Sequence, residues 1–285
     1  MNSSISNIIE VGACHNYLAS LIFEKNKKVN YTIIEPSFTG DRTNLNIIND
    51  YFENVKLNNI NADTIIMSDV FEHFYNPIDI LKKIQNSSIK HIYMSHPDFD
   101  YSIKNHFFTN LNSEHTFLIE HDYLFKLFEK YGFKLNRKFN FENYSLFIEF
   151  IRIDEDITCD NKLINYTTRE NVNLYIKHIF EINNKINNYM IDNQNKQFYI
   201  WHTSVHSTTL FTFGLDYKKL SGILDNSPNK IGKYIYGYNL LCSSFNDLLK
   251  SREENICVFI SGAGNYIKEL DLTNTNIEII FINEL

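Results

Sequence analysis

Short apolar runs that end at polar residues recur along the first half of the chain. They occupy positions 7–12, 29–35, 63–69 and 91–95. Runs of this length are typical of strands that are buried on both faces of a sheet. Helix-sized intervals separate them, which predicts a parallel α/β sheet. Because ligands of such sheets bind at the carboxyl ends of the strands, the pattern alone predicts a site near Gly12, Glu35 and Asp69.

The intervals carry helix signals. Asn76 and Pro77 stand where an N-cap and a first helical residue belong, and Gly132 is a typical residue just past a helix end. The further elements expected in this half are a helix over 15–25, another apolar run over 45–52, a helix that begins at Pro77 and has apolar residues at 78, 81 and 84, a helix over 121–131, and a closing hairpin from 133–139 and 145–153.

The second half repeats this alternation after a polar stretch and one long amphipathic helix from Glu170 to about Asn193. The elements expected after it are strands over 198–203, 219–225, 256–261 and 277–283, with helices near 206–213 and 244–250. We therefore predict an α/β fold with a Rossmann-like domain over 1–153, a linker and helix over 154–195, and a second, smaller α/β domain over 196–285.

Composition and charge narrow the class of protein. The 285 residues include 44% hydrophobic residues and carry a net charge of −7 without a basic stripe, so nucleic acid is not an expected partner. No apolar run approaches the length of a membrane span, and the N-terminus lacks a signal pattern. These features predict a cytoplasmic protein that is not bound to a membrane; the oligomeric state stays open.

The four cysteines are Cys14, Cys159, Cys242 and Cys257. Their spacing is not that of a metal site, and they lie in or beside apolar segments. We predict reduced, buried thiols.

The loop after the first strand predicts a nucleotide site with altered chemistry. Gly12 lets the backbone approach a ligand, but Cys14 replaces the second glycine of the dinucleotide fingerprint, so dinucleotides are disfavoured. Glu35 ends the second strand, where an acid accepts hydrogen bonds from ribose hydroxyls. Asp69 ends the run over 63–69, where it could contact an adenine amino group. Each feature has an alternative interpretation. The loop at Gly12 could be a simple turn, Glu35 could be a solvated strand end, and Asp69 could be a helix cap.

Three segments together resemble motifs of class I methyltransferases that use S-adenosylmethionine: 8–12, 33–36 and 63–73. Segments 112–117 with 121–132, and 224–234, are similar to parts of C-methyltransferases that act on nucleotide-linked deoxysugars. The chain departs from that family in lacking its N-terminal zinc domain, in its altered glycine loop, and at 201–207. These departures indicate a different acceptor or a rearranged pocket.

The resemblance implies S-adenosylmethionine as cofactor and His115 with Glu114 as catalytic residues facing the substrate. A histidine suits removal of a proton from the acceptor because it titrates near neutral pH; the alternative is a structural histidine. The residues expected to hold the cofactor are Glu10, Gly12, Ala13, Tyr17, Glu35, Pro36, Asp69, Val70 and His73.

A polar cluster at the start of the second domain is the predicted acceptor site. Side chains there, and the following helix N-terminus, could hold phosphates or sugar hydroxyls; the alternative is an ordinary surface turn. The residues expected to bind substrate are Tyr75, His96, His202, Ser204, His206, Asp225 and Lys233. His202 and His206 are four residues apart, but the strand ends between them and no third ligand is indicated, so no metal is expected.

The sequence thus predicts methyl transfer to a small polar metabolite, with a nucleotide-activated sugar or related surface-polysaccharide precursor as the leading acceptor. Whether carbon, oxygen or nitrogen is methylated stays open. The alternative is a catalytically inactive binding or scaffolding protein that keeps the methyltransferase shape, which the altered glycine loop suggests. A zinc hydrolase built on His202 and His206 is a more distant alternative.

Overall fold

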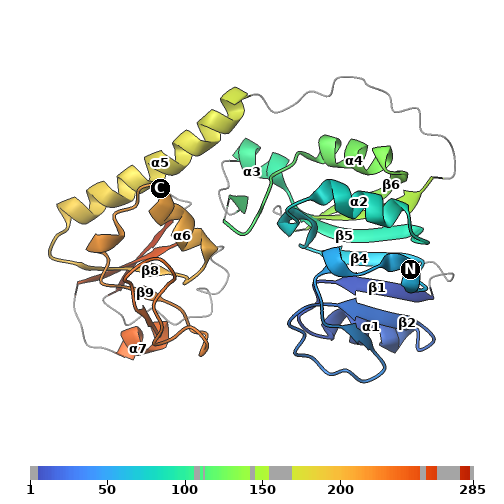
Figure 1. Cartoon of the computed structure of the whole chain (residues 1–285). Helices are drawn as coiled ribbons and strands as arrows, with labels where there is room; N and C mark the ends of the chain where they lie inside the picture. The colour runs from blue at the N-terminus through green and yellow to red at the C-terminus, as the bar shows by residue number, and fades with distance from the viewer. Residues whose placement is uncertain are drawn as a thin grey trace. The chain divides into compact units, whose positions relative to one another are not determined.

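The computed structural model describes residues 6–105, 110–111, 113–141, 145–153, 169–250, 255–261 and 277–282. The chain divides into two compact units. The first comprises residues 1–102 and 115–167, and the second comprises residues 103–114 and 168–285 (Figure 1). A short segment from the middle of the first half therefore belongs with the second unit, which no local pattern indicated.

The first unit is built on a seven-stranded sheet in the order β3-β2-β1-β4-β5-β7-β6. Its strands are β1 (Asn7–Val11), β2 (Asn30–Ile34), β3 (Asn46–Ile48), β4 (Thr64–Ser68), β5 (His91–Pro97), β6 (Phe133–Phe141) and β7 (Ser145–Arg152). The first five are parallel, and β7 pairs antiparallel with both β5 and β6. The doubly wound Rossmann-like α/β prediction is confirmed, including the closing hairpin.

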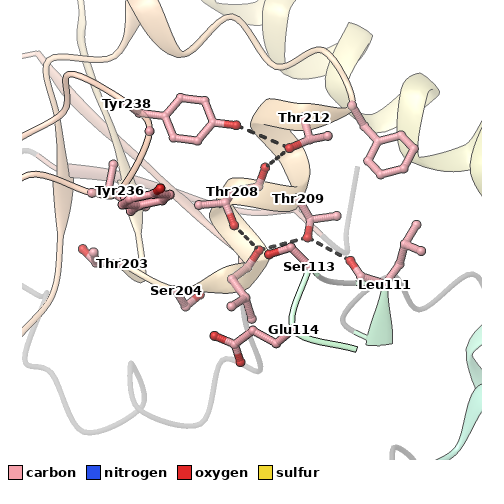
Figure 2. A pocket seen from close by; sticks show the side chains of 14 residues that line it. Leu111, Ser113, Glu114, Thr203, Ser204, Thr208, Thr209, Thr212, Tyr236 and Tyr238 are labelled. Atoms are coloured by element: carbon pink, nitrogen blue, oxygen red, sulfur yellow. Dashed lines mark hydrogen bonds between the residues drawn. The ribbon is translucent and has the colours of Figure 1, made fainter. Parts of the chain in front are cut away.

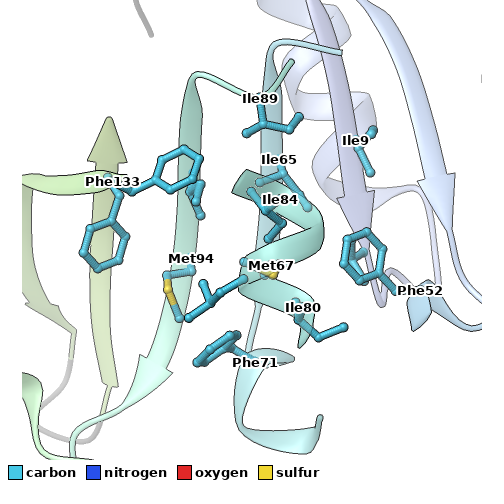
Figure 3. Packing of buried hydrophobic residues seen from close by; sticks show 14 of the residues in the cluster. Ile9, Phe52, Ile65, Met67, Phe71, Ile80, Ile84, Ile89, Met94 and Phe133 are labelled. Carbon is cyan, nitrogen blue, oxygen red and sulfur yellow. The ribbon is translucent and has the colours of Figure 1, made fainter. Parts of the chain in front are cut away.

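Consecutive residues of the central strands are buried on opposite faces of this sheet. Ile9, Ile65 and Met67 belong to one core cluster, and Ile8 and Ile66 belong to another. Figure 3 shows Ile80 and Ile84 of α2 packed over the β4 residues of the first cluster. Side chains alternate along a strand, so a strand covered on both faces must be apolar throughout. This is the physical reason for the continuous apolar runs.

The first unit contains α1 (Tyr17–Lys25), α2 (Pro77–Gln85) and α4 (His121–Lys130), with 3₁₀ turns at Phe52–Asn54, Leu57–Asn59 and Phe71–His73. The division between the units falls within α3 (Phe99–Asn105), after residue 102. The Asn76 side chain accepts a hydrogen bond from the Asp79 amide, as a cap does. Gly132 follows α4 with a φ of +87°, as expected for a C′ glycine. The α3 helix was not predicted, because its seven residues carry too few apolar positions to show a period.

A buried carboxylate ties the hairpin to the rest of the sheet. Glu149 on β7 accepts hydrogen bonds from the Tyr93 hydroxyl, the Asn136 amide and the Arg137 guanidinium, each at 2.7 Å. Burial alone would raise the pKa of Glu149, but these hydrogen bonds outweigh it and hold the pKa below its ordinary value.

We expect Glu149→Gln to lower the free energy of unfolding by about 1–3 kcal/mol at neutral pH, because charge-assisted hydrogen bonds are lost. A carboxylate with a depressed pKa contributes its full stabilisation above the pKa of the unfolded state and loses it as pH falls through the folded-state pKa. The variant should therefore lose less stability than the wild type on acidification below about pH 5. Urea unfolding at neutral and acidic pH measures this, with the exposed Glu24→Gln as control; equal acid sensitivity of wild type and Glu149→Gln would contradict it.

The second unit has a five-stranded sheet in the order β10-β9-β8-β11-β12, and every pair in it is parallel. The strands are β8 (Gln197–Trp201), β9 (Gly222–Leu224), β10 (Cys242–Ser243), β11 (Ile256–Ile260) and β12 (Ile277–Phe281). In both sheets the strand order reverses direction beside the first strand: between β1 and β4 in the first sheet, and between β8 and β11 in the second. The second α/β domain is thus present, but β9 is shorter than predicted because Tyr217–Lys219 forms a 3₁₀ turn. The two-residue β10 was not predicted.

Three helices belong to this unit: α5 (Arg169–Asp192), α6 (Val205–Thr212) and α7 (Phe245–Lys250). The α5 helix, expected to join the halves, buries an apolar stripe in the second unit. Asn183 is almost wholly buried on that stripe and donates a 2.9 Å hydrogen bond to the Leu210 carbonyl. Among the described helices, none combines the length and the apolar character that a bilayer span requires.

The cysteines correct one expectation. Cys242 and Cys257 are buried free thiols, and burial raises the pKa of each. Cys14 is free but exposed, because it lies in the loop after β1 and not in the strand itself. Cys159 lies outside the described residues, as do residues 154–168 around it.

Candidate functional site

Three neighbouring strands of the first sheet bring the predicted cofactor residues to one edge. Gly12, Glu35 and Asp69 directly follow β1, β2 and β4, which are adjacent in the sheet and parallel. The carboxyl ends of parallel strands meet at one edge, so these residues share the edge where ligands of such sheets bind. Sequence position alone therefore placed them correctly in the fold, while their contacts with a ligand stay predictions.

The backbone at Gly12 is one that only glycine accommodates well. Its φ is +78°, and its amide donates a 3.0 Å hydrogen bond to the Ile34 carbonyl. A Cβ atom at this position would lie 2.5 Å from Cγ2 of Val70, which follows Asp69 on the neighbouring strand end. Two of the predicted cofactor residues, Gly12 and Val70, thus pack so closely that a side chain at position 12 would overlap with Val70.

The altered part of the glycine loop is held by the segment after β2. The Cys14 carbonyl accepts a hydrogen bond from the Thr39 amide, and the Asn16 side-chain oxygen accepts one from the Asp41 amide. Gly40 packs so closely that a Cβ atom there would lie 2.8 Å from the Asn16 nitrogen. Contacts within the protein therefore order the loop where the fingerprint would have glycines.

The remaining predicted cofactor residues have different surroundings. Glu10 is buried on β1, where it accepts a 2.8 Å hydrogen bond from the Tyr31 hydroxyl, and burial raises its pKa. Ala13 is half-buried, whereas Tyr17 and Pro36 are exposed. Glu35 is nearly buried and accepts a 2.7 Å hydrogen bond from the Ser37 amide through one oxygen.

His73 and His115 come together from segments far apart in the sequence. Their rings lie edge to face with centroids 5.2 Å apart. Thr116 fixes this arrangement: its amide and hydroxyl donate to the Glu72 carbonyl at 2.9 and 3.0 Å, and the hydroxyl also reaches the Phe74 carbonyl at 2.7 Å. The segment that carries His115 is therefore held against the turn after β4.

Glu72, between these histidines and the core, was missed in the sequence. It is 1% exposed, burial raises its pKa to about 8, and among the described residues neither carboxylate oxygen has a hydrogen-bond partner. Its oxygens lie within 4.8 Å of ring nitrogens of His73 and His115, a grouping that could hold a metal ion. The Phe71-Glu72-His73 string gave no local signal of this, because burial depends on the folded core.

A second histidine cluster lies after β5. The His121 Nδ1 atom is 2.9 Å from Asp100 and its Nε2 atom is 3.5 Å from Asp98, a group that could also hold a metal ion. His96 is buried close enough to His115 and His121 to feel their charge, and burial lowers its pKa to about 3. His96 was predicted to bind substrate; His121 and the two aspartates were not singled out.

Tyr75 and Glu114 are two further predicted residues. Tyr75 is 92% exposed. Glu114, paired with His115 in the sequence, belongs to the second unit, whereas His115 belongs to the first. Adjacent residues therefore serve different units, and a shared catalytic role for the pair stays a prediction.

In the second unit, His202 and Asp225 follow the neighbouring strands β8 and β9. Burial lowers the pKa of His202, which feels the Asp225 charge. Asp225 pairs with Lys230 at 2.8 Å, and the same ammonium donates to the Thr203 carbonyl at 2.7 Å. Lys230, which was not singled out in the sequence, is therefore the lysine that pairs with Asp225. The predicted Lys233 is exposed. His202 and His206 are not part of any metal-capable group among the described residues.

A cavity of about 710 Å³ opens beside α6 in the second unit (Figure 2). Its volume is within the range of small-molecule sites. Ser204 is the predicted substrate residue that lines it, together with Glu114. The other lining residues were not predicted: Leu111, Ser113, Thr203, Val205, Thr208, Thr209, Thr212, Phe213, Ile235, Tyr236, Gly237 and Tyr238.

Comparison with known proteins finds one family model that is similar to part of the chain. Residues 2–138, just under half of the chain, match the family model described as Methyltransferase domain. No curated protein matches the chain.

Solved structures that are similar to the chain cover about half of it. A chain of the Haloferax volcanii complex between the Trm112 methyltransferase activator and a methyltransferase has 11% identity and a TM-score of 0.44, covering 53% of this chain and 84% of that one. The N-terminal domain of EvdMO1 with SAH bound has 13% identity and a TM-score of 0.37, covering 53% and 77%. The O-methyltransferase NcsB1 in complex with S-adenosylmethionine has 10% identity and a TM-score of 0.41, covering 53% and 50%.

Proposed function

We propose that this chain, whose residues 2–138 match a methyltransferase domain, transfers a methyl group from S-adenosylmethionine to a small polar metabolite. The observation that carries the proposal is the arrangement of one edge of the first sheet. Gly12, Glu35 and Asp69 follow three adjacent strands there, and His73 and His115 meet after β4.

These residues fit the proposed cofactor. Gly12 has no Cβ atom, so its backbone can approach a ligand, and Glu35 at the end of β2 is the proposed acceptor of hydrogen bonds from ribose hydroxyls. Asp69, with a φ of +50°, presents its carboxylate after β4. When bound, S-adenosylmethionine supplies a methyl group on a positively charged sulfonium.

His115 is the proposed base. Methyl transfer from a sulfonium leaves a neutral thioether, so no acid is needed and catalysis depends on alignment and on removal of the acceptor's proton. The imidazole nitrogen would accept that proton as the acceptor's electron pair attacks the methyl carbon. Thr116 supports this role because its two hydrogen bonds to the Glu72 carbonyl fix the backbone beside His115.

For the acceptor we propose a nucleotide-activated sugar. The resemblance of segments 112–117, 121–132 and 224–234 to sugar C-methyltransferases supports it. The contacts of the 14–16 loop with 39–41 favour the rival, a methyltransferase-like protein that only binds, because they order the loop without a ligand.

Calorimetric titration of the full-length protein with S-adenosylmethionine and S-adenosylhomocysteine distinguishes the two. We expect micromolar binding at one site per chain. Absence of binding to either ligand, in protein shown to be folded by circular dichroism, would overturn the proposal in favour of the rival. Incubation with nucleotide sugars, followed by mass spectrometry and NMR of the product, then identifies the acceptor and the methylated atom.

Glu35→Ala should weaken S-adenosylhomocysteine binding by about 1–3 kcal/mol, or roughly 5- to 150-fold, if its hydrogen bonds to ribose are buried. The 7% exposure of Glu35 makes such bonds largely water-excluded. Calorimetry of the variant against the wild type measures the loss, and Glu53→Ala, another glutamate of the first unit, is the control. An unchanged dissociation constant for Glu35→Ala would refute this role.

A further inference from the structure

The cavity beside α6 is lined by several hydroxyl side chains. Its residues come from the second unit alone: the α6 face, the loop after β8, the 235–238 loop and the 111–114 segment (Figure 2). Hydroxyl groups dominate its polar surface. What such a surface can bind depends on whether those hydroxyls offer hydrogen atoms or lone pairs.

The threonine hydroxyls of α6 have already used their hydrogen atoms. Thr208 donates to the Val205 carbonyl at 2.8 Å, and Thr212 donates to the Thr208 carbonyl at 2.8 Å. Thr209 lies 2.8 Å from the Leu111 carbonyl and 2.9 Å from the Val205 carbonyl. A hydroxyl has one hydrogen atom and two lone pairs. The hydroxyls therefore retain lone pairs to present to a ligand, but no hydrogen atom.

The hydroxyl hydrogen of Tyr238 is also engaged within the protein. Its hydroxyl lies 3.3 Å from the Thr212 hydroxyl, whose hydrogen points to the Thr208 carbonyl. Tyr238 is consequently the donor of that pair, and its hydrogen is also engaged (Figure 2).

The charge of the cavity agrees with an acceptor-rich lining. Glu114 contributes a carboxylate, and the described lining residues include no lysine, arginine or histidine. The nearby ammonium of Lys230 is engaged by Asp225 and by the Thr203 carbonyl. A phosphate would meet a carboxylate and lone pairs here, with the first amides of α6 as its main compensation.

An aromatic surface completes the lining. Tyr236 is 96% exposed, and its ring lies in the wall of the cavity. The face of an exposed tyrosine attracts a cation and also packs against apolar C–H groups. The Ser204 hydroxyl, which is buried and has no hydrogen-bond partner among the described residues, remains a possible donor. The threonine lone pairs, the Glu114 carboxylate and the Tyr236 ring face favour a ligand that donates hydrogen bonds and carries positive charge.

We propose that this cavity binds a hydroxylated small molecule with a protonated amine, such as an amino sugar or an aminocyclitol. The ammonium is held by Glu114 and the α6 threonines, and the ring packs on Tyr236. The inference goes beyond the proposed methyl transfer and uses no residue of the first unit. It also implies that the diphosphate of a nucleotide sugar is not held in this cavity.

The test compares three ligands with one ring on the full-length protein: glucosamine at a pH where its amine is protonated, N-acetylglucosamine and glucose 6-phosphate. Calorimetry or saturation-transfer NMR measures binding. We expect glucosamine to bind most tightly, N-acetylglucosamine more weakly and the phosphate least. Glu114→Gln should weaken glucosamine binding about 10-fold and Thr208→Val about 3- to 10-fold, because each removes acceptor capacity. Thr43→Val, on the surface of the first unit, should leave it unchanged.

Tighter binding of glucose 6-phosphate would overturn the inference in favour of an anion site at the start of α6. Failure of all three ligands to bind, or glucosamine binding that neither variant weakens, would also overturn it. Circular dichroism and S-adenosylhomocysteine binding on the same preparations verify folding and test the first unit separately. Failure here with donor binding intact therefore leaves the proposed methyl transfer standing, and the converse result leaves the amine site standing.

Discussion

His115→Ala should lower turnover about 10²- to 10⁴-fold, the usual contribution of a positioned general base, while S-adenosylhomocysteine affinity stays nearly unchanged. The imidazole lies against His73 after β4, on a segment that Thr116 fastens to the Glu72 carbonyl. Alanine removes the proton acceptor without removing these backbone hydrogen bonds. Steady-state kinetics with the acceptor identified by the product screen, together with calorimetry of donor binding, measure the two effects.

A merely structural role for His115 would give a different pattern. A base must be neutral to accept a proton, so wild-type turnover should fall at acidic pH as the imidazole becomes protonated, and the variant should lose this dependence. His178→Ala, on α5, is the control histidine. Equal turnover of His115→Ala and wild type, or an unchanged pH profile at reduced turnover, would remove His115 as the base.

Gly12→Ala should lower the free energy of unfolding by about 2–5 kcal/mol and weaken donor binding at least about 10-fold. A non-glycine residue at positive φ costs about 1–2 kcal/mol, and overpacking costs about 1–3 kcal/mol. Both apply, because φ is +78° and the new methyl group would lie 2.5 Å from Val70 Cγ2. Donor binding should suffer because any relaxation moves the backbone that is proposed to approach the ligand.

Two variants separate the backbone strain from the overlap. Gly132 has a φ of +87°, and no neighbouring atom lies within 4 Å of the place that an alanine methyl group would take, so Gly132→Ala should show the strain alone. In the Gly12→Ala, Val70→Ala double variant the overlap is gone and the strain remains. Urea unfolding gives each cost, and we expect non-additivity between positions 12 and 70. If Gly12→Ala were as stable as Gly132→Ala, Val70 would move away from the new methyl group without lowering the free energy of unfolding, which would contradict the expected overlap cost.

The apolar runs were sufficient to determine much of the first unit. A strand covered on both faces needs continuous apolar residues, and a parallel sheet needs helices between its strands. The runs at 7–12, 29–35 and 63–69 therefore show from local sequence alone that they form buried parallel strands. They also place Gly12, Glu35 and Asp69, because strand ends are visible as the points where apolar residues give way to polar ones. Caps such as Asn76 and Gly132 are equally local.

The second unit was less visible because its elements are short. The three residues of β9 and the two of β10 are stabilised by their neighbours in the sheet, so their own residues show no period. The helix α3 and the transfer of residues 103–114 to the second unit likewise depend on packing between distant segments.

The sequence by itself determined the class of fold and the edge of the sheet at which Gly12, Glu35 and Asp69 lie. The tertiary structure decided which side chains meet. Only folding buries Glu72 beside two histidines, pairs Asp225 with Lys230, and brings the Thr209 hydroxyl to the Leu111 carbonyl. Local pattern records the periodicity of single elements, whereas burial and hydrogen-bond partners are properties of segments brought together from far apart in the chain.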